Sequence, residues 1–162
     1  MASRKNQLNI FLADLAAMNI KVHNLHWNVT GSKFIIVHKL TEKLYKMFQL
    51  QFDEIAELMK MQNEMPLAAM ADYLENTTID EIESRDYSAY EVLQILDGDC
   101  DKIMQQAKKI RDEADKKDNF LVANKLEEYL EIYAKHSWML RAMLQDDDLP
   151  IEMEEDEESD DE

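Results

Sequence analysis

The chain has 162 residues, enough for one domain with a sizeable core but short for two. Its two glycines and two prolines exclude the glycine-rich phosphate-binding motifs and argue against turn-rich β-sandwiches and barrels. A net charge of −17, from 35 acidic residues and 18 lysines and arginines, argues against a nucleic-acid-binding surface over the whole protein, while 46% hydrophobic residues exclude wholesale disorder.

Four long segments carry apolar residues at three- and four-residue steps, the spacing of one helix face. These segments cover residues 8–29, 34–63, 88–114 and 119–144. A short extra helix is expected over residues 66–75, with Pro66 at its start. Residues 1–145 are therefore predicted to form one all-α domain, an antiparallel four-helix bundle with a short extra helix in its middle connection.

Local signals mark several helix ends. Gly31 follows the first segment, where a left-handed cap is common. Ser88 and Glu91 have the spacing of a capping box at the start of the third helix. Gly98 lies inside that helix, where it marks either a kink or a close helix approach.

The last 17 residues, 146–162, differ from the rest of the chain because they hold twelve acids and no lysine or arginine. Such a block repels itself and is predicted to be a disordered acidic tail. Without it the body of the protein carries a charge of only −5.

The sequence also predicts a compartment. Cys100 is the only cysteine and cannot form an intramolecular disulfide, which fits a reducing interior. No apolar run is long enough to cross a bilayer, and Asp14 interrupts the one stretch near the N-terminus that could act as a signal-peptide core. We expect a cytoplasmic protein.

Histidines and acids suggest a metal site. His26 lies near the end of the first helix and His38 near the start of the second, while Asp53 and Glu57 are four residues apart on one helix face. Imidazole and carboxylate ligands together suit iron or zinc. The alternatives are a chance acidic pair and histidines that interact with exposed carbonyls at a helix end.

Spacing restricts where such a site could form. His38 and Asp53 are fifteen residues apart, about 22 Å along one helix, so they cannot bind one metal within a subunit. If two copies of the second helix run antiparallel across a two-fold axis, His38 of one copy faces Asp53 and Glu57 of the other. The pattern predicts a site between subunits.

Linked motifs resemble those of the Dps family, the miniferritins named for DNA protection during starvation. The resemblance covers residues 5–145. It rests on Leu12-Ala-Asp-Leu, His23-Asn-Leu-His26-Trp27-Asn-Val-x-Gly31, Phe34-x-x-Val-His38-x-x-x-Glu42-x-x-Tyr45, Asp53-x-x-x-Glu57 and Lys135-His-Ser-Trp-Met-Leu-Arg-Ala-Met-Leu144. The 12-15-4 spacing of His26, His38, Asp53 and Glu57 matches the family's ferroxidase ligands.

The resemblance implies a ferritin-like fold, a shell of twelve subunits, and oxidation of Fe(II) by hydrogen peroxide or oxygen with storage of ferric mineral. It assigns Asp53 and Glu57 of one subunit, and His26 and His38 of its neighbour, to the iron. Glu42 is placed near the second metal position and Trp27 is a redox neighbour. Zinc is a substitute metal for the same ligands.

The chain departs from the family in its charge. Many members carry a lysine-rich tail that captures DNA, whereas here only Arg4 and Lys5 precede the first helix and the C-terminal tail is acidic. We therefore expect weak or no DNA binding. The alternative function is a nucleoid-associated protein that compacts DNA and has minor iron chemistry.

Overall fold

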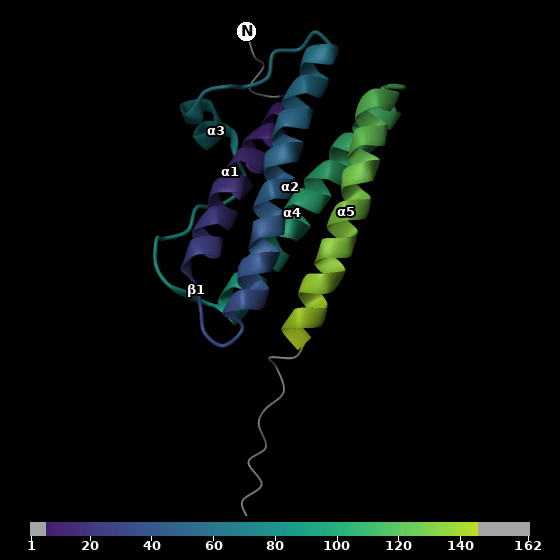
Figure 1. Cartoon of the computed structure of the whole chain (residues 1–162). Helices are drawn as coiled ribbons and strands as arrows, with labels where there is room; N and C mark the ends of the chain where they lie inside the picture. The colour runs from purple at the N-terminus through teal and green to yellow at the C-terminus, as the bar shows by residue number, and fades with distance from the viewer. Residues whose placement is uncertain (1–5, 146–162) are drawn as a thin grey trace, which may run out of the picture.

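The computed structural model describes residues 6–145, and these form a helical bundle (Figure 1). The long helices are α1 (Gln7–Asn28), α2 (Phe34–Met61), α4 (Ala89–Asp115) and α5 (Phe120–Gln145). Helices α1 and α2 form one antiparallel hairpin and α4 and α5 form a second, packed against the first (Figure 1). The all-α four-helix bundle predicted from the sequence is confirmed, whereas the expected acidic tail, residues 146–162, lies outside the described residues.

One long connection joins the two hairpins. It leaves α2 at one end of the bundle, includes the short helix α3 (Met70–Asn76), and returns to the other end, so that α2 and α4 run parallel (Figure 1). There the strand β2 (Tyr87–Ser88) pairs in parallel with β1 (Val29–Thr30). This two-residue ladder, which the sequence did not predict, fixes the start of α4 beside the end of α1.

Helix ends follow from local hydrogen bonds. Ser88 and Glu91 form the predicted capping box at the start of α4. Two non-glycine residues in the left-handed region, Asn63 (φ 59°) and Asp118 (φ 54°), end α2 and α4. After each of them the next backbone N–H donates to a carbonyl in the last helical turn, from Glu64 to Met59 at 2.9 Å and from Asn119 to Ala114 at 2.9 Å.

The structure corrects the predicted start of the short helix and excludes one of the two explanations for Gly98. Helix α3 begins at Met70 rather than at Pro66, because the intervening segment is held by tertiary hydrogen bonds. The Leu67 N–H donates to Asn9 Oδ1 at 2.9 Å, and the Leu67 carbonyl accepts from the Tyr73 hydroxyl at 2.7 Å. A Cβ at Gly98 would meet nothing within 4 Å, so a close helix approach does not explain that glycine.

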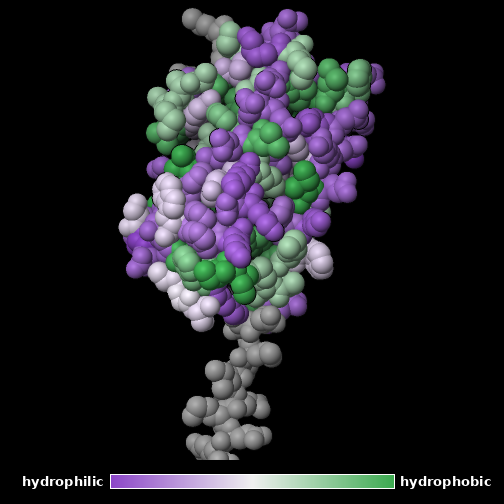
Figure 2. Space-filling view, in the orientation of Figure 1, coloured by the Kyte–Doolittle hydropathy of each residue, from purple (hydrophilic) through white to green (hydrophobic). Residues whose placement is uncertain are grey.

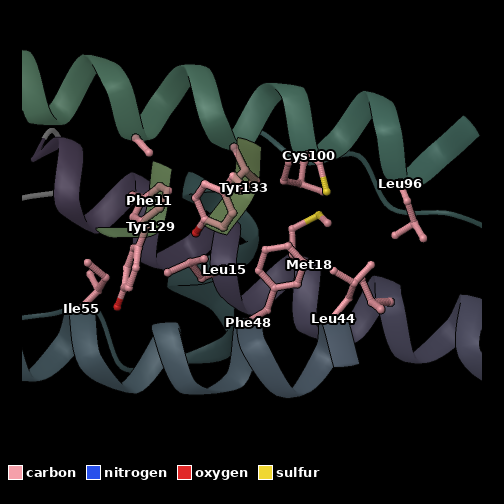
Figure 3. Packing of buried hydrophobic residues seen from close by; sticks show 14 of the residues in the cluster. Phe11, Leu15, Met18, Leu44, Phe48, Ile55, Leu96, Cys100, Tyr129 and Tyr133 are labelled. Atoms are coloured by element: carbon pink, nitrogen blue, oxygen red, sulfur yellow. The ribbon is translucent and has the colours of Figure 1, made fainter. Parts of the chain in front are cut away.

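The core lies between the four long helices. Apolar side chains from α1, α2, α4 and α5 point toward one another, among them Phe11, Leu15, Met18, Leu44, Phe48, Ile55, Leu96, Cys100, Tyr129 and Tyr133 (Figure 3). Burial raises the pKa of the Cys100 thiol to about 12, so this cysteine stays protonated. No helix among residues 6–145 is both long and apolar enough to cross a membrane.

Charged groups are also buried in the bundle. Lys21 Nζ on α1 lies 2.6 Å from Asp99 Oδ2 on α4, and both side chains are less than a tenth exposed. Asp14 on α1 accepts hydrogen bonds from the backbone N–H and hydroxyl of Thr78 and from the hydroxyl of Thr77, which attaches the long connection to the bundle. Burial raises the pKa of Asp14, partly offset by these hydrogen bonds.

We expect Lys21→Met to lower the free energy of unfolding by about 3–5 kcal/mol, because Asp99 would stay buried without its counter-ion. The double variant Lys21→Met, Asp99→Leu should recover most of that loss, since it removes both charges. Urea unfolding followed by circular dichroism, at one fixed protein concentration, measures both changes. A single variant as stable as the parent would show that this pair does not stabilise the bundle.

Candidate metal centre

Two predicted ligands meet where α1 ends and α2 begins. His26 lies in the last turn of α1 and His38 in the second turn of α2. The connection between the helices is short, and Gly31 takes the positive φ of 99° that its turn requires. The two imidazole rings stack with their centroids 3.8 Å apart and their planes 18° from parallel. The short turn therefore brings His26 and His38 together, as a shared metal site would need.

Each histidine ring is held by the backbone of the other. His26 Nδ1 lies 2.9 Å from the His38 carbonyl oxygen, and His38 Nδ1 lies 2.9 Å from the His26 carbonyl oxygen. A carbonyl can only accept, so both Nδ1 atoms carry the proton in the neutral rings. The two Nε2 atoms then keep their lone pairs for a metal, which is the usual arrangement of metal-ligating histidines.

Thr41 supports this arrangement from the next turn of α2. Its hydroxyl lies 2.9 Å from the carbonyls of both Val37 and His38, which are its acceptors, and its oxygen is 3.0 Å from His26 Nδ1. Thr41 is fully buried and His26 is 8% exposed. Desolvation lowers the pKa of His26, which favours the neutral imidazole that binds metals.

A carboxylate and aromatic rings surround the histidine pair. Glu42 lies close enough that its charge partly offsets the lowering of the His26 pKa by desolvation, although Glu42 also pairs with Lys46 on the next turn. The hydrogen bond and charge of Lys46 are the main reason why the pKa of Glu42 is lowered. Tyr45 stacks on His23 at 3.9 Å and meets the edge of His26 at 5.2 Å.

Trp27 is 69% exposed beside this cluster, so it does not belong to the core of the subunit. Its indole ring lies 5.3 Å from the ring of His23. A large apolar side chain this exposed next to candidate ligands fits better with an interface than with a solvent-facing surface.

Asp53 and Glu57 lie elsewhere. Both are exposed on α2, and Asp53 is fifteen residues beyond His38 on the same continuous helix. Within the described range 6–145, no three histidine, cysteine or acidic side chains are placed so that they could hold a metal ion. One subunit thus brings together His26 and His38, with Glu42 nearby, and leaves Asp53 and Glu57 apart from them.

Sequence reasoning missed Thr41 and the stacking of His23 on Tyr45. Thr41 follows His38 by three residues, so helical spacing places both on one face, and a hydroxyl there is a recognisable signal. The contact of Thr41 with His26 depends on the geometry of the turn and has no local signature.

Comparison with known proteins shows which family the chain belongs to. A family model described as a ferritin-like domain matches residues 5–149. A "DNA protection during starvation protein" from Brevibacillus brevis is 33% identical over 85% of this chain and 92% of its own length. The chain belongs to the Dps family of ferritin-like proteins. It is similar to the crystal structure of a Dps protein from Bacillus brevis, with a TM-score of 0.82 at 33% identity over 85% of this chain and 92% of that one.

The description of a second solved Dps structure names the kind of metal centre found in its superfamily. The Dps protein from Vibrio cholerae O1, described as a member of a broad superfamily of ferritin-like diiron-carboxylate proteins, has a TM-score of 0.82 and 26% identity, over 86% of this chain and 87% of that one. Membership of the Dps family supports a role in iron storage in general terms.

We expect Thr41→Val to weaken metal binding at the histidine pair by about 10-fold, because His26 Nδ1 loses one of its two oxygen partners. Thr30→Val is the matched control, since its hydroxyl donates to the Tyr87 carbonyl instead. Anaerobic calorimetric titration with Co(II), a redox-stable probe, compares the two variants. Equal affinity in both would remove Thr41 from the support of the site.

Proposed function

We propose that this protein is a ferroxidase that stores and detoxifies iron. Fe(II) is the substrate, hydrogen peroxide or oxygen is the oxidant, and ferric mineral collects inside a shell of twelve subunits in the cytoplasm. The observation that carries the proposal is the histidine pair, in which both Nε2 atoms are available while Asp53 and Glu57 lie too far along α2 to reach them.

The proposed site lies between two subunits. Asp53 and Glu57 of one subunit and His26 and His38 of its neighbour bind the first iron. Glu42 is the carboxylate for the second metal position, which its charge interaction with His26 supports. Such a mixture of nitrogen and oxygen ligands with open positions lets an oxidant reach the metal.

Exposed apolar side chains along α1 and α2 offer a surface for a second subunit. Ile20 and Trp27 on α1 and Leu50 on α2 are each about 60% exposed or more. Large exposed apolar side chains on two adjacent helices favour burial against another chain. An isologous dimer through these helices would create two equivalent sites.

The reaction consumes iron in pairs. Two Fe(II) ions each give up one electron, and one hydrogen peroxide accepts both, with two protons, to form two waters. Because the peroxide bond is reduced in one two-electron event, no hydroxyl radical is released, and this is the protective consequence. We assign Trp27, next to His26 in the sequence, as the donor of the second electron that hydrogen peroxide needs when only one Fe(II) is present. Zinc, which has no redox chemistry, would occupy the same ligands and block them.

A mixing experiment tests whether the site is shared. His26→Ala and Asp53→Ala subunits should each have little ferroxidase activity alone. When they are co-expressed in equal amounts, half of the dimers are mixed, and each mixed dimer holds one intact site of two. We therefore expect about a quarter of the parent activity in the mixture, measured as Fe(III) absorbance after peroxide is added anaerobically.

Two results would oppose the proposal. No recovery in the mixture would mean that each subunit holds its own site. Parent-like rates in the His26→Ala, Asp53→Ala double variant would remove the ferroxidase assignment. Asp101→Ala, which changes an exposed carboxylate on α4, is the matched control and should keep full activity.

The second candidate function, compaction of DNA, is opposed by charge. The body carries −5 and residues 146–162 add twelve acids, so a DNA phosphate backbone meets net repulsion. We expect no retardation of supercoiled DNA in a gel at about 0.15 M salt, where charges are screened beyond about 8 Å. Strong retardation of the purified protein at that salt would favour the DNA-binding function.

A further inference from the structure

Helices α2 and α5 lie side by side, and the half of this pair that contains the start of α2 and the end of α5 is basic. Residues 34–52 of α2 and 132–145 of α5 contain a single acid, Glu42, and five cations. We call this region the basic half, and its cations are Lys39, Lys43, Lys46, Lys135 and Arg141. Its net charge is +4. The remaining residues of the two helices, 53–61 and 120–131, carry six acids and two lysines, a net charge of −4.

The basic half is formed by both helices together. Helix α2 begins at the end of the bundle where α5 ends, and the two run antiparallel (Figure 1). Their register is fixed by buried hydrogen bonds, such as the one from the Tyr133 hydroxyl to Gln51 Oε1 at 2.6 Å. Lys43 on α2 and Lys135 on α5 both lie near His136, where their charges add to burial in lowering its pKa.

Most cations of the basic half have no acidic partner among residues 6–145. Only Lys46 forms an ion pair there, with Glu42. Lys39, Lys43 and Lys135 are exposed and in no ion pair of the described chain, and Arg141 Nη1 lies 2.5 Å from the Ser137 hydroxyl oxygen rather than near a carboxylate. The face over α2 and α5 is largely hydrophilic, with separate hydrophobic patches (Figure 2). A polyanion would therefore find unpaired cations on this surface.

The chain itself supplies such a polyanion. Segment 146–162 follows Gln145, the last residue of α5, and so starts beside the basic half. It holds twelve acids and no cation. Its 17 residues can reach at most about 60 Å, whereas the stretch of α5 from Lys135 to Gln145 is about 15 Å long. Attachment to the end of α5 also gives the segment a local concentration on the order of millimolar.

We propose that the acidic C-terminal segment 146–162 binds electrostatically to the basic half of α2 and α5. The contact pairs carboxylates of the segment with the ammonium groups of Lys39, Lys43 and Lys135 and needs no single fixed conformation. It places the twelve acids of the segment over a surface with a net charge of +4, so that this surface is occupied before any external polyanion arrives.

Carbodiimide cross-linking of the full-length assembled protein tests the contact directly, because it joins a carboxylate and an ammonium group only where they touch. Trypsin then releases residues 142–162 as one peptide, since this range has no lysine or arginine after Arg141. We expect this peptide joined to Lys39, Lys43 or Lys135 at about 0.01 M salt, and a several-fold lower yield at about 1 M, where the screening length falls from about 30 Å to about 3 Å.

Two charge-reversal variants separate a specific contact from general attraction. Lys39→Glu, Lys43→Glu lowers the charge of the basic half from +4 to 0 and should reduce the remaining cross-link to Lys135 several-fold. Lys108→Glu, Lys109→Glu makes the same change at exposed positions on α4 and should leave that cross-link unchanged. The link between Lys125 and Glu128, 3.0 Å apart on α5, is the internal standard for the reaction.

Three outcomes would overturn the proposal. The first is a C-terminal peptide with no cross-link at low salt while the Lys125 standard forms. The second is an equal reduction in both charge-reversal variants, which would indicate attraction without a site. The third is cross-links from the basic half to acids of the folded body in place of the segment, which would show that a neighbouring subunit covers this surface.

Discussion

The length and continuity of α2 determine what one subunit can and cannot do. The helix spans 28 residues, about 42 Å, without interruption, and it holds His38 near its start and Asp53 and Glu57 in its second half. Because a helix does not bend back on itself, no side-chain motion brings these groups to one ion. The proposed metal chemistry therefore depends on a second copy of the chain.

The turn between α1 and α2 is the complementary element. It is short enough to stack His26 on His38, and the mutual Nδ1–carbonyl hydrogen bonds fix both rings before any metal arrives. The ladder between Val29–Thr30 and Tyr87–Ser88 attaches the same turn to the start of α4. The histidine half of the proposed site is therefore already ordered in one subunit, which would limit the entropy cost of metal binding.

Much of the fold could be predicted from the sequence because it depends on local signals. Apolar periodicity located the four long helices, and Ser88 with Glu91 located the start of α4 within a residue. The predicted start of α3 was wrong. Pro66 is a favourable first residue for a helix, but the hydrogen bonds of Leu67 to Asn9 and Tyr73 keep residues 66–69 outside the helix. Those bonds join residues 58 and six positions apart, and no local pattern encodes them.

The candidate site likewise has features that helix spacing predicts and contacts that only the tertiary structure shows. Spacing predicts that Asp53 and Glu57 share a helix face and that His38 lies too far away, since helix rise alone decides both. The stacking of His26 on His38 and the contact of Thr41 with His26 depend on the conformation of the turn between α1 and α2, which could not be predicted from the sequence. Residue types therefore indicated the proposed ligands, and the tertiary structure shows the hydrogen bonds that orient His26 and His38.

The packing inside the bundle explains why the proposed metal ligands lie on its surface and not at its centre. Di-iron bundles of another kind place Glu-x-x-His pairs at the centre, and no glutamate in this chain precedes a histidine by three residues. Here the ion pair Lys21–Asp99, the hydrogen bond from Tyr133 to Gln51 and close-packed apolar side chains fill the space between the helices. With its centre filled, the bundle holds the proposed ligands on its surface, where a second subunit would complete the coordination and exclude water.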